Sequence, residues 1–404
     1  MVLETLPIVF VLTGLVFYLV LGGADFGAGL WQLAAGRGEP AGRIRDHAHH
    51  SMGPVWEANH VWLIFVITVL WTAYSQVFAS IASTLSIPFF VAAVGIVLRG
   101  GAYALRSGTR SGREQRAVET VLSVSSILTP MALGMIVGAI AGGRVPVGNA
   151  AGDLVTSWLN PLSVVTGLIT VAFSAYLAAV FLSADAVRRG DPALEAAFRA
   201  RALASGAVAG LAAALGIGAL RSDAPHLFHE LVAGRALPAL VASAVAGVAT
   251  LALVYRRRYE PARYSAAVAV AAVVAGWGLA QAPELLPGLT IERAAAPRDT
   301  LLALTAAVIA GGIVLFPSLG VLFRLFLADQ LGAAERSAGA PSGHAPLVDA
   351  DRLVVRGAQA CLVLGLGLLV LADAGWAHAV GASALLVSAA LAARVLISAD
   401  VLGD

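Results

Sequence analysis

The stretch GPVWEANHVWLIFVITVLW, residues 53–71, places three polar side chains directly before a long apolar run. They are a carboxylate, an amide and an imidazole, on Glu57, Asn59 and His60. Such groups are costly in a membrane unless they face a partner or water. Glu57 and His60 are three residues apart and share one helix face. Carboxylates and imidazoles are the side chains that carry protons in membrane relays, so the stretch indicates a proton path.

A second acidic side chain, Asp25, lies in the apolar segment LGGADFGAG. At about 1.5 Å per residue, we place Asp25 roughly 12 Å and Glu57 roughly 8 Å inside the membrane from the cytoplasmic face. We therefore expect the two carboxylates at similar depth on consecutive helices. Neighbouring glycines let another backbone approach Asp25: Gly22, Gly23, Gly27 and Gly29.

Other interpretations of these polar residues stay open. The cluster could be a hydrogen-bonded knot that fixes the first helix pair, or an anchor at the membrane interface. His60 could be a haem or metal ligand, but it lacks a second ligand at comparable depth, so we expect no metal site. The histidines at positions 47, 49 and 50 are expected to be solvated, and the single Cys361 excludes a disulfide framework.

The elements that carry these residues are membrane-spanning helices. The chain has 404 residues, of which 59% are hydrophobic and 12% charged, about half the charged fraction of a soluble domain. A span needs about 20 apolar residues. Eleven such helices are predicted, with a tight turn after Tyr74, at residues 5–33, 52–74, 77–99, 117–141, 157–184, 200–220, 236–255, 264–281, 299–326, 354–373 and 376–396.

The arginines predict the orientation. All 26 basic residues are arginine, and with the N-terminus outside, 21 of them fall in cytoplasmic segments, Arg99 included, against five outside. Since positive residues collect on the cytoplasmic side, we predict N-out and C-in. Residues 331–351 read as a flexible cytoplasmic linker. This linker separates a nine-span domain, residues 1–330, from a two-helix hairpin, residues 352–404.

Several stretches together resemble subunit II of the cytochrome bd-type quinol oxidases. They are GGADFGAGLW, GPVWEANHVWLI, LRGGAYALR, GLTIERAAAP and LFPSLGVLFRLF, and they occur in the order of the family over residues 1 to 330. The resemblance implies a nine-span fold of two four-helix bundles and one peripheral helix. It also implies a heterodimer in a bacterial plasma membrane.

In that heterodimer, subunit I carries haem b and haem d and oxidises quinol, and the complex reduces oxygen to water in aerobic respiration. Subunit II supports that assembly, in some members holds a quinone, and contributes a cytoplasmic proton path. Asp25 and Glu57 fall on the acidic positions of the family motifs. We assign no cofactor to this chain, and we expect no nucleic-acid partner.

The chain departs from the family pattern at three positions. Family members usually have aspartate at Glu57, glutamine at His60 and glutamate at Ala104. The loss of the last carboxylate puts a relay through Ala104 in doubt. Two competing functions are a proton-coupled secondary transporter and a purely structural membrane scaffold; the absence of a detectable internal repeat counts against the transporter.

Overall fold

The computed structural model describes residues 2–36, 38–52, 56–106 and 112–336, and short pieces between residues 354 and 391. Within this part of the chain, seven helices are long and apolar enough to cross a membrane, or eight if one bent pair counts as a single span. A further apolar helix, Asn59–Ala73, is shorter. The protein is therefore an all-α membrane protein, as predicted.

The described helices and strands follow one another along the chain, with one long connection, residues 142–160, between α7 and α8. Their bounds are α1 Val2–Phe17, the π-helix η1 Tyr18–Gly22, α2 Gly23–Leu33, α3 Glu39–Met52, α4 Trp56–Ala73, α5 Ser75–Thr84, α6 Ser86–Arg106, α7 Gly112–Ala141, α8 Pro161–Arg188, α9 Pro192–Asp223, α10 Pro225–Val232, α11 Leu237–Tyr255, α12 Tyr259–Gln281, β1 Glu284–Leu286, β2 Leu289–Thr290, α13 Ile291–Ala294 and α14 Arg298–Arg336.

The starts of two long helices are set by local sequence. Asn160 caps α8 by accepting a hydrogen bond from the backbone N–H of Ser163, 3.0 Å away. Asp191 caps α9 in the same way, and proline follows each cap, where its missing N–H costs nothing. The backbone N–H of Leu194 and the guanidinium of Arg43 hold the pKa of Asp191 below its usual value.

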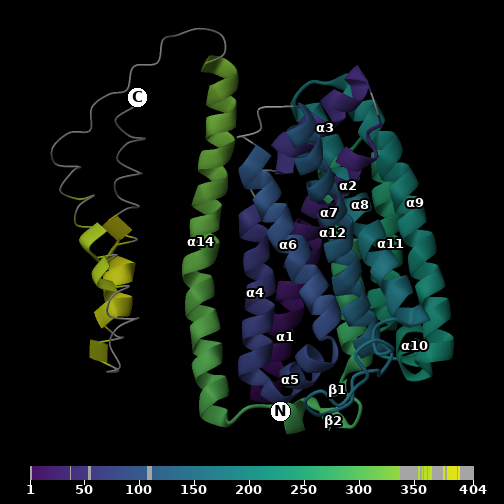
Figure 1. Cartoon of the computed structure of the whole chain (residues 1–404), viewed down its shortest axis with the longest axis vertical. Coiled ribbons are helices and arrows are strands. Elements are labelled where there is room, and N and C mark those ends of the chain that lie inside the picture. The colour runs from purple at the N-terminus through teal and green to yellow at the C-terminus, as the bar shows by residue number, and fades with distance from the viewer. Residues whose placement is uncertain are drawn as a thin grey trace. The chain divides into compact units, whose positions relative to one another are not determined.

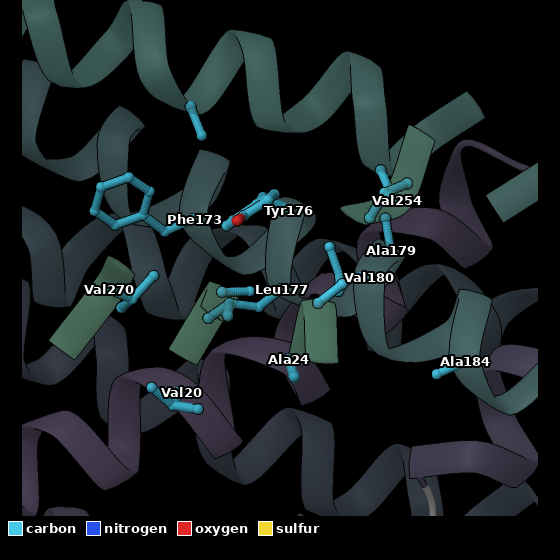
Figure 2. Packing of buried hydrophobic residues seen from close by; sticks show 14 of the residues in the cluster. Val20, Ala24, Phe173, Tyr176, Leu177, Ala179, Val180, Ala184, Val254 and Val270 are labelled. Atoms are coloured by element: carbon cyan, nitrogen blue, oxygen red, sulfur yellow. The ribbon is translucent and has the colours of Figure 1, made fainter. Parts of the chain in front are cut away.

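Helix α8 is the centre of residues 2–315, which form one compact unit. It packs against α2, α7, α9 and α12. In Figure 1, α3 lies at one end of these helices, here called the α3 end, and β1 and β2 lie at the opposite end, the hairpin end. The largest apolar cluster, shown in Figure 2, surrounds Tyr176, Leu177 and Val180 of α8.

Small residues bring the helix backbones close together, as expected for the glycines beside Asp25. A Cβ atom placed on Gly138 of α7 would lie 2.6 Å from the Cα of Ser163 on α8. One placed on Gly27 of α2 would lie 1.9 Å from the carbonyl oxygen of Ser174, also on α8. Any side chain at these two glycines would therefore push α8 away.

The structure corrects the third predicted span, residues 77–99. This segment is two helices, α5 and α6, bent by 83° around Leu85, although the turn at Tyr74 is as tight as predicted. The segment after the first span is also not a plain loop but holds the 14-residue helix α3.

The C-terminal part of the chain is described only in pieces. A second unit comprises Phe316–Asp404 and begins within α14. The predicted linker, residues 331–351, lies largely outside the described residues, as do most of the tenth and eleventh spans. The hairpin at residues 352–404 stays a prediction.

Candidate functional site

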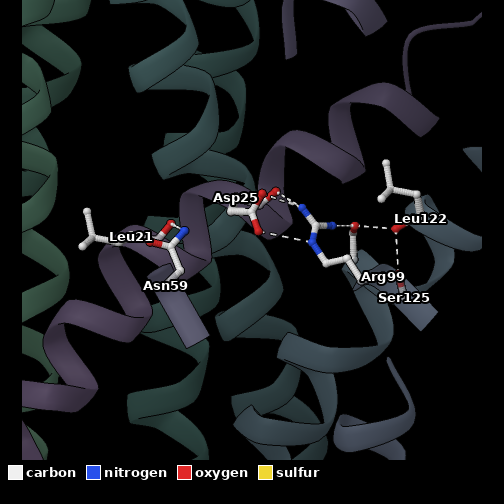
Figure 3. Close-up of polar contacts among 7 residues, drawn as sticks. Leu21, Asp25, Asn59, Arg99, Leu122 and Ser125 are labelled. Atoms are coloured by element: carbon white, nitrogen blue, oxygen red, sulfur yellow. Dashed lines mark hydrogen bonds and ion pairs between the residues drawn. The ribbon is translucent and has the colours of Figure 1, made fainter. Parts of the chain in front are cut away.

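Asp25 lies on α2 and forms an ion pair with Arg99 of α6, and both side chains are 0% exposed. Arg99 Nη2 donates to Oδ1 of Asp25 at 2.6 Å, and Nε donates to Oδ2 at 3.2 Å. Nη2 also donates to the backbone carbonyl of Asp25 at 2.9 Å. The guanidinium thus holds the carboxylate through two parallel bonds, as Figure 3 shows.

Helix α7 completes the surroundings of the guanidinium. Arg99 Nη1 donates to the hydroxyl of Ser126, which in turn donates to the carbonyl of Leu122 at 2.5 Å. The ring of Phe26 lies on another side, with its centroid 5.1 Å from the guanidinium carbon. The buried charges are therefore compensated by hydrogen bonds and by an aromatic face, which buried ions require.

Gly29 of α2 makes room for this arrangement. A Cβ atom at Gly29 would lie 2.1 Å from Ser126 Oγ and 3.1 Å from Arg99 Nη1. Since Gly29 is four residues after Asp25, it lies one turn further along the same face of α2. The glycine that follows the acid therefore lets the hydroxyl and the guanidinium reach it.

Asn59 of α4 approaches Asp25 from the other side of the first span. Its side chain is 3% exposed, and its Nδ2 donates to the carbonyl of Leu21 at 3.3 Å (Figure 3). Leu21 belongs to the π-helix η1, four residues before Asp25. Wide turns of this kind loosen the backbone hydrogen bonding and frequently mark functional sites. Asn59 therefore fixes α4 to the irregular turn that precedes the acid.

His60 lies beside the same turn. Its ring meets the rings of Tyr18 and Phe26 edge-on, with centroids 6.1 Å away in each case. Because Phe26 also covers Arg99, one ring joins His60 to the ion pair. Three of the four predicted site residues, Asp25, Asn59 and His60, are therefore brought around one segment, residues 18–26.

Glu57, the fourth predicted residue, is in the first turn of α4. Its side chain lies outside the described part of the chain, as does that of Ala104, so the expected match in depth between Glu57 and Asp25 stays a prediction.

Arg99 is the buried ion-pair partner of Asp25 that sequence reasoning missed. We counted it among the cytoplasmic arginines, which was wrong, because it is completely buried. Arg99 directly follows the apolar run IPFFVAAVGIVL, residues 87–98, a position that is equally typical of a cytoplasmic boundary. Spacing within one helix cannot show such a partner.

His47 was also misjudged as a solvated histidine. It is 2% exposed, and its Nε2 hydrogen-bonds the carbonyl of Leu182 on α8 at 3.0 Å. Burial lowers the pKa of His47. The side chain fastens α3 to α8.

A cavity of about 200 Å³ opens at the α3 end, between α2, α3 and α7. Its walls are formed by Gln32, Leu33, Arg45, Glu119, Thr120 and Ser123. Gln32 is 4% exposed, and its Oε1 is buried without a hydrogen-bond partner. Among the described residues, no three His, Cys, Asp or Glu side chains are grouped as a metal site would need.

Comparisons with known proteins agree on one family. Residues 3–326 match the family model described as cytochrome bd terminal oxidase subunit II. The structure of the bd oxidase from Geobacillus thermodenitrificans contains a chain that is 28% identical, with a TM-score of 0.67. That match covers 81% of this chain and 99% of the other.

Two proteins of Bacillus subtilis strain 168 are also similar. Cytochrome bd ubiquinol oxidase subunit 2 is 27% identical over 129 residues, which are 31% of this chain and 37% of that protein. A protein provisionally named cytochrome bd menaquinol oxidase subunit II is 22% identical over 348 residues, 81% of this chain and 96% of its own length.

Proposed function

Because the chain belongs to the cytochrome bd terminal oxidase subunit II family, we propose that it supports a haem-bearing subunit I in a complex that oxidises quinol and reduces oxygen to water. The haem b and haem d groups are placed in subunit I, and no cofactor is assigned to residues of this chain. Binding of a quinone by this chain is an expectation that follows from the resemblance alone.

The proposed arrangement in the membrane has nine spans in residues 1–330, as two four-helix bundles and a peripheral helix, followed by the C-terminal hairpin. The α3 end faces the cytoplasm, with the N-terminus outside and the C-terminus inside. The packing of α8 against α2 and α7, and also against α9 and α12, supports the two bundles. The complex belongs in the plasma membrane of a bacterium.

Within this complex, the chain contributes a cytoplasmic proton path through Asp25, Glu57, Asn59 and His60. The observation that carries this proposal is a carboxylate with 0% exposure on a spanning helix, beside an irregular turn that Asn59 and His60 both touch. Ionisable residues in spans are expensive and mark proton relays in many membrane proteins. Arg99 joins the group as the fixed positive charge next to the path.

The same geometry favours a second role, in which the Asp25–Arg99 pair fixes α2, α6 and α7 together and moves no proton. The observation behind it is the set of bonds that Arg99 donates to both carboxylate oxygens and to Ser126. Under this role, the acid could change without slowing oxygen reduction, provided that the fold survives.

Two conservative substitutions test the proton path in the purified complex. Asp25→Asn and Glu57→Gln should each slow oxygen consumption at least about tenfold, because a positioned proton carrier contributes about 10²–10⁴-fold, and the haem spectrum of subunit I should be unchanged. Asp153→Asn, an exposed loop acid at the hairpin end, is the matched control and should be silent. Full activity in both variants would defeat the path, and loss of the haem spectrum would favour the structural role.

A further inference from the structure

The cavity at the α3 end lies on the line of residues that leads to the buried ion pair. On α2, Asp25, Gly29 and Gln32 follow one another at four and three residues, so they share one face of the helix. On α7, Glu119, Ser123 and Ser126 follow the same spacing. The two faces meet, because Gly29 lies against Ser126.

The seam between these faces therefore has three levels. The innermost holds Asp25 and Arg99, and the next holds Gly29 and Ser126, whose hydroxyl accepts from Arg99. The outermost level is the cavity itself, with Gln32 and Ser123 in its wall. Ser123 and Ser126 are three residues apart, so the cavity wall is about 5 Å along the helix from the hydroxyl that holds Arg99.

The chemistry of the cavity suits water. Its wall carries an amide, two hydroxyls, a carboxylate and a guanidinium, against a single apolar side chain, Leu33. Gln32 is almost completely buried, yet its carbonyl oxygen has no partner within the protein. A buried amide oxygen left without a hydrogen bond is destabilising, and a water molecule in a cavity of this size would supply the missing bond.

We infer that this cavity is the water entrance from the cytoplasm to the Asp25–Arg99 pair, running along the seam of α2 and α7 and ending at Ser126. This entrance is separate from the face of α4 that carries Glu57 and His60. It supplies an access route in a chain that has Ala104 in place of an acid. The role of this water in delivering protons rests on the proposed function. The presence of water in the cavity does not depend on it.

Cysteine substitution tests the entrance in the purified complex, after Cys361→Ala removes the one native cysteine of this chain. A thiol reacts with a charged, water-soluble methanethiosulfonate only where water ionises it. Ser123→Cys should react at least about tenfold faster than Val124→Cys, the next residue on α7, which is 51% exposed on the apolar outside of the bundle. Labelling is read on the separated subunit, so it needs no oxidase activity.

The attached group should then obstruct the entrance and slow oxygen consumption by the Ser123→Cys complex at least about fivefold. Equal labelling of the two positions overturns the inference, and so does a labelled complex that turns over at its original rate. If Ser123→Cys does not assemble, Gln32→Cys on the opposite wall carries the same expectation against the same control.

The outcomes separate this inference from the proposed function. If labelling at Ser123→Cys slows turnover while Asp25→Asn and Glu57→Gln do not, the entrance stands and the acidic path beyond it is wrong. If the two acidic variants slow turnover and Ser123→Cys does not react, the acidic path stands and the entrance is wrong.

Discussion

At the scale of single residues, the central feature is a pair of opposite charges with no exposure at all. Asp25 and Arg99 together carry no net charge, which is why two ions can be placed inside a membrane protein. Each is acceptable only because the other is present. The pair is therefore one unit, and its two members should respond to substitution as one unit.

A double-substitution experiment tests this coupling. Asp25→Leu and Arg99→Met alone should each lower the free energy of unfolding by about 3–5 kcal/mol, since each leaves an unpaired buried charge. The free energy of unfolding of the double variant should fall by much less than the sum of the two single losses, because two apolar residues can replace a buried ion pair at little cost. Thermal denaturation of the complex, followed by intrinsic fluorescence, gives the comparison. Additive losses would show that the two charges do not stabilise one another.

Some of the site residues could be predicted from the sequence, and others could not. Asp25 and Asn59 stand out because polar side chains are rare in apolar segments, and the structure buries both. Arg99 does not stand out, because an arginine at the end of an apolar run is also the usual mark of a cytoplasmic boundary. Only the contact with another helix decides between the two roles. Glu57 remains a prediction from its position in α4.

At the scale of elements, the site depends on how closely α2 approaches its neighbours. The carbonyl of Ser174 on α8 occupies the space that a side chain at Gly27 would need, two residues after Asp25. Because backbone cannot move out of the way as a flexible side chain can, this contact fixes the distance between α2 and α8. It thereby fixes the position of α2, the helix that carries Asp25.

Gly27→Ala should therefore destabilise the complex by about 1–3 kcal/mol, the usual cost of overpacking, and should also lower oxidase activity. Gly210→Ala is the matched control, since Gly210 lies in the spanning helix α9 with nothing within 4 Å of an added Cβ atom. Thermal denaturation and oxygen consumption are measured for both variants. Equal behaviour of the two would mean that the close approach at Gly27 does not position the site.

Hydropathy predicts where helices run but not how they are interrupted. The first span appears as one apolar segment, yet it contains the π-helix at residues 18–22, and the third is bent by 83° at Leu85. Averages over about 20 residues cannot register a single wide turn or a bend. Helix α3 was missed for a different reason: its buried residues Ala41, Ile44 and Ala48 recur at helical spacing, but within a polar segment.

At the scale of the whole molecule, the predicted orientation assigns the arginines unequally to the two sides of the membrane. Moving Arg99 into the interior leaves 20 arginines in the segments assigned to the cytoplasm against five outside, so the asymmetry survives the correction. Several at the α3 end pair with acids across helices: Arg43 with Asp191, and Arg263 with Asp185 at 3.1 Å. Surface pairs of this kind add little stability, so the asymmetry serves orientation more than folding.

The orientation can be measured directly. In the Cys361→Ala background, Gly42→Cys on α3 and Asn149→Cys in the loop after α7 place one thiol at each end of the bundle. A Cβ atom added at Gly42 would have no atom within 4 Å, so the substitution is accommodated without a clash. Because positively charged segments are retained in the cytoplasm, a membrane-impermeant maleimide should label Asn149→Cys in intact cells and Gly42→Cys only in inverted vesicles. The reverse pattern would put the cavity at the α3 end outside the cell, and the water that enters it could then not carry protons from the cytoplasm to Asp25.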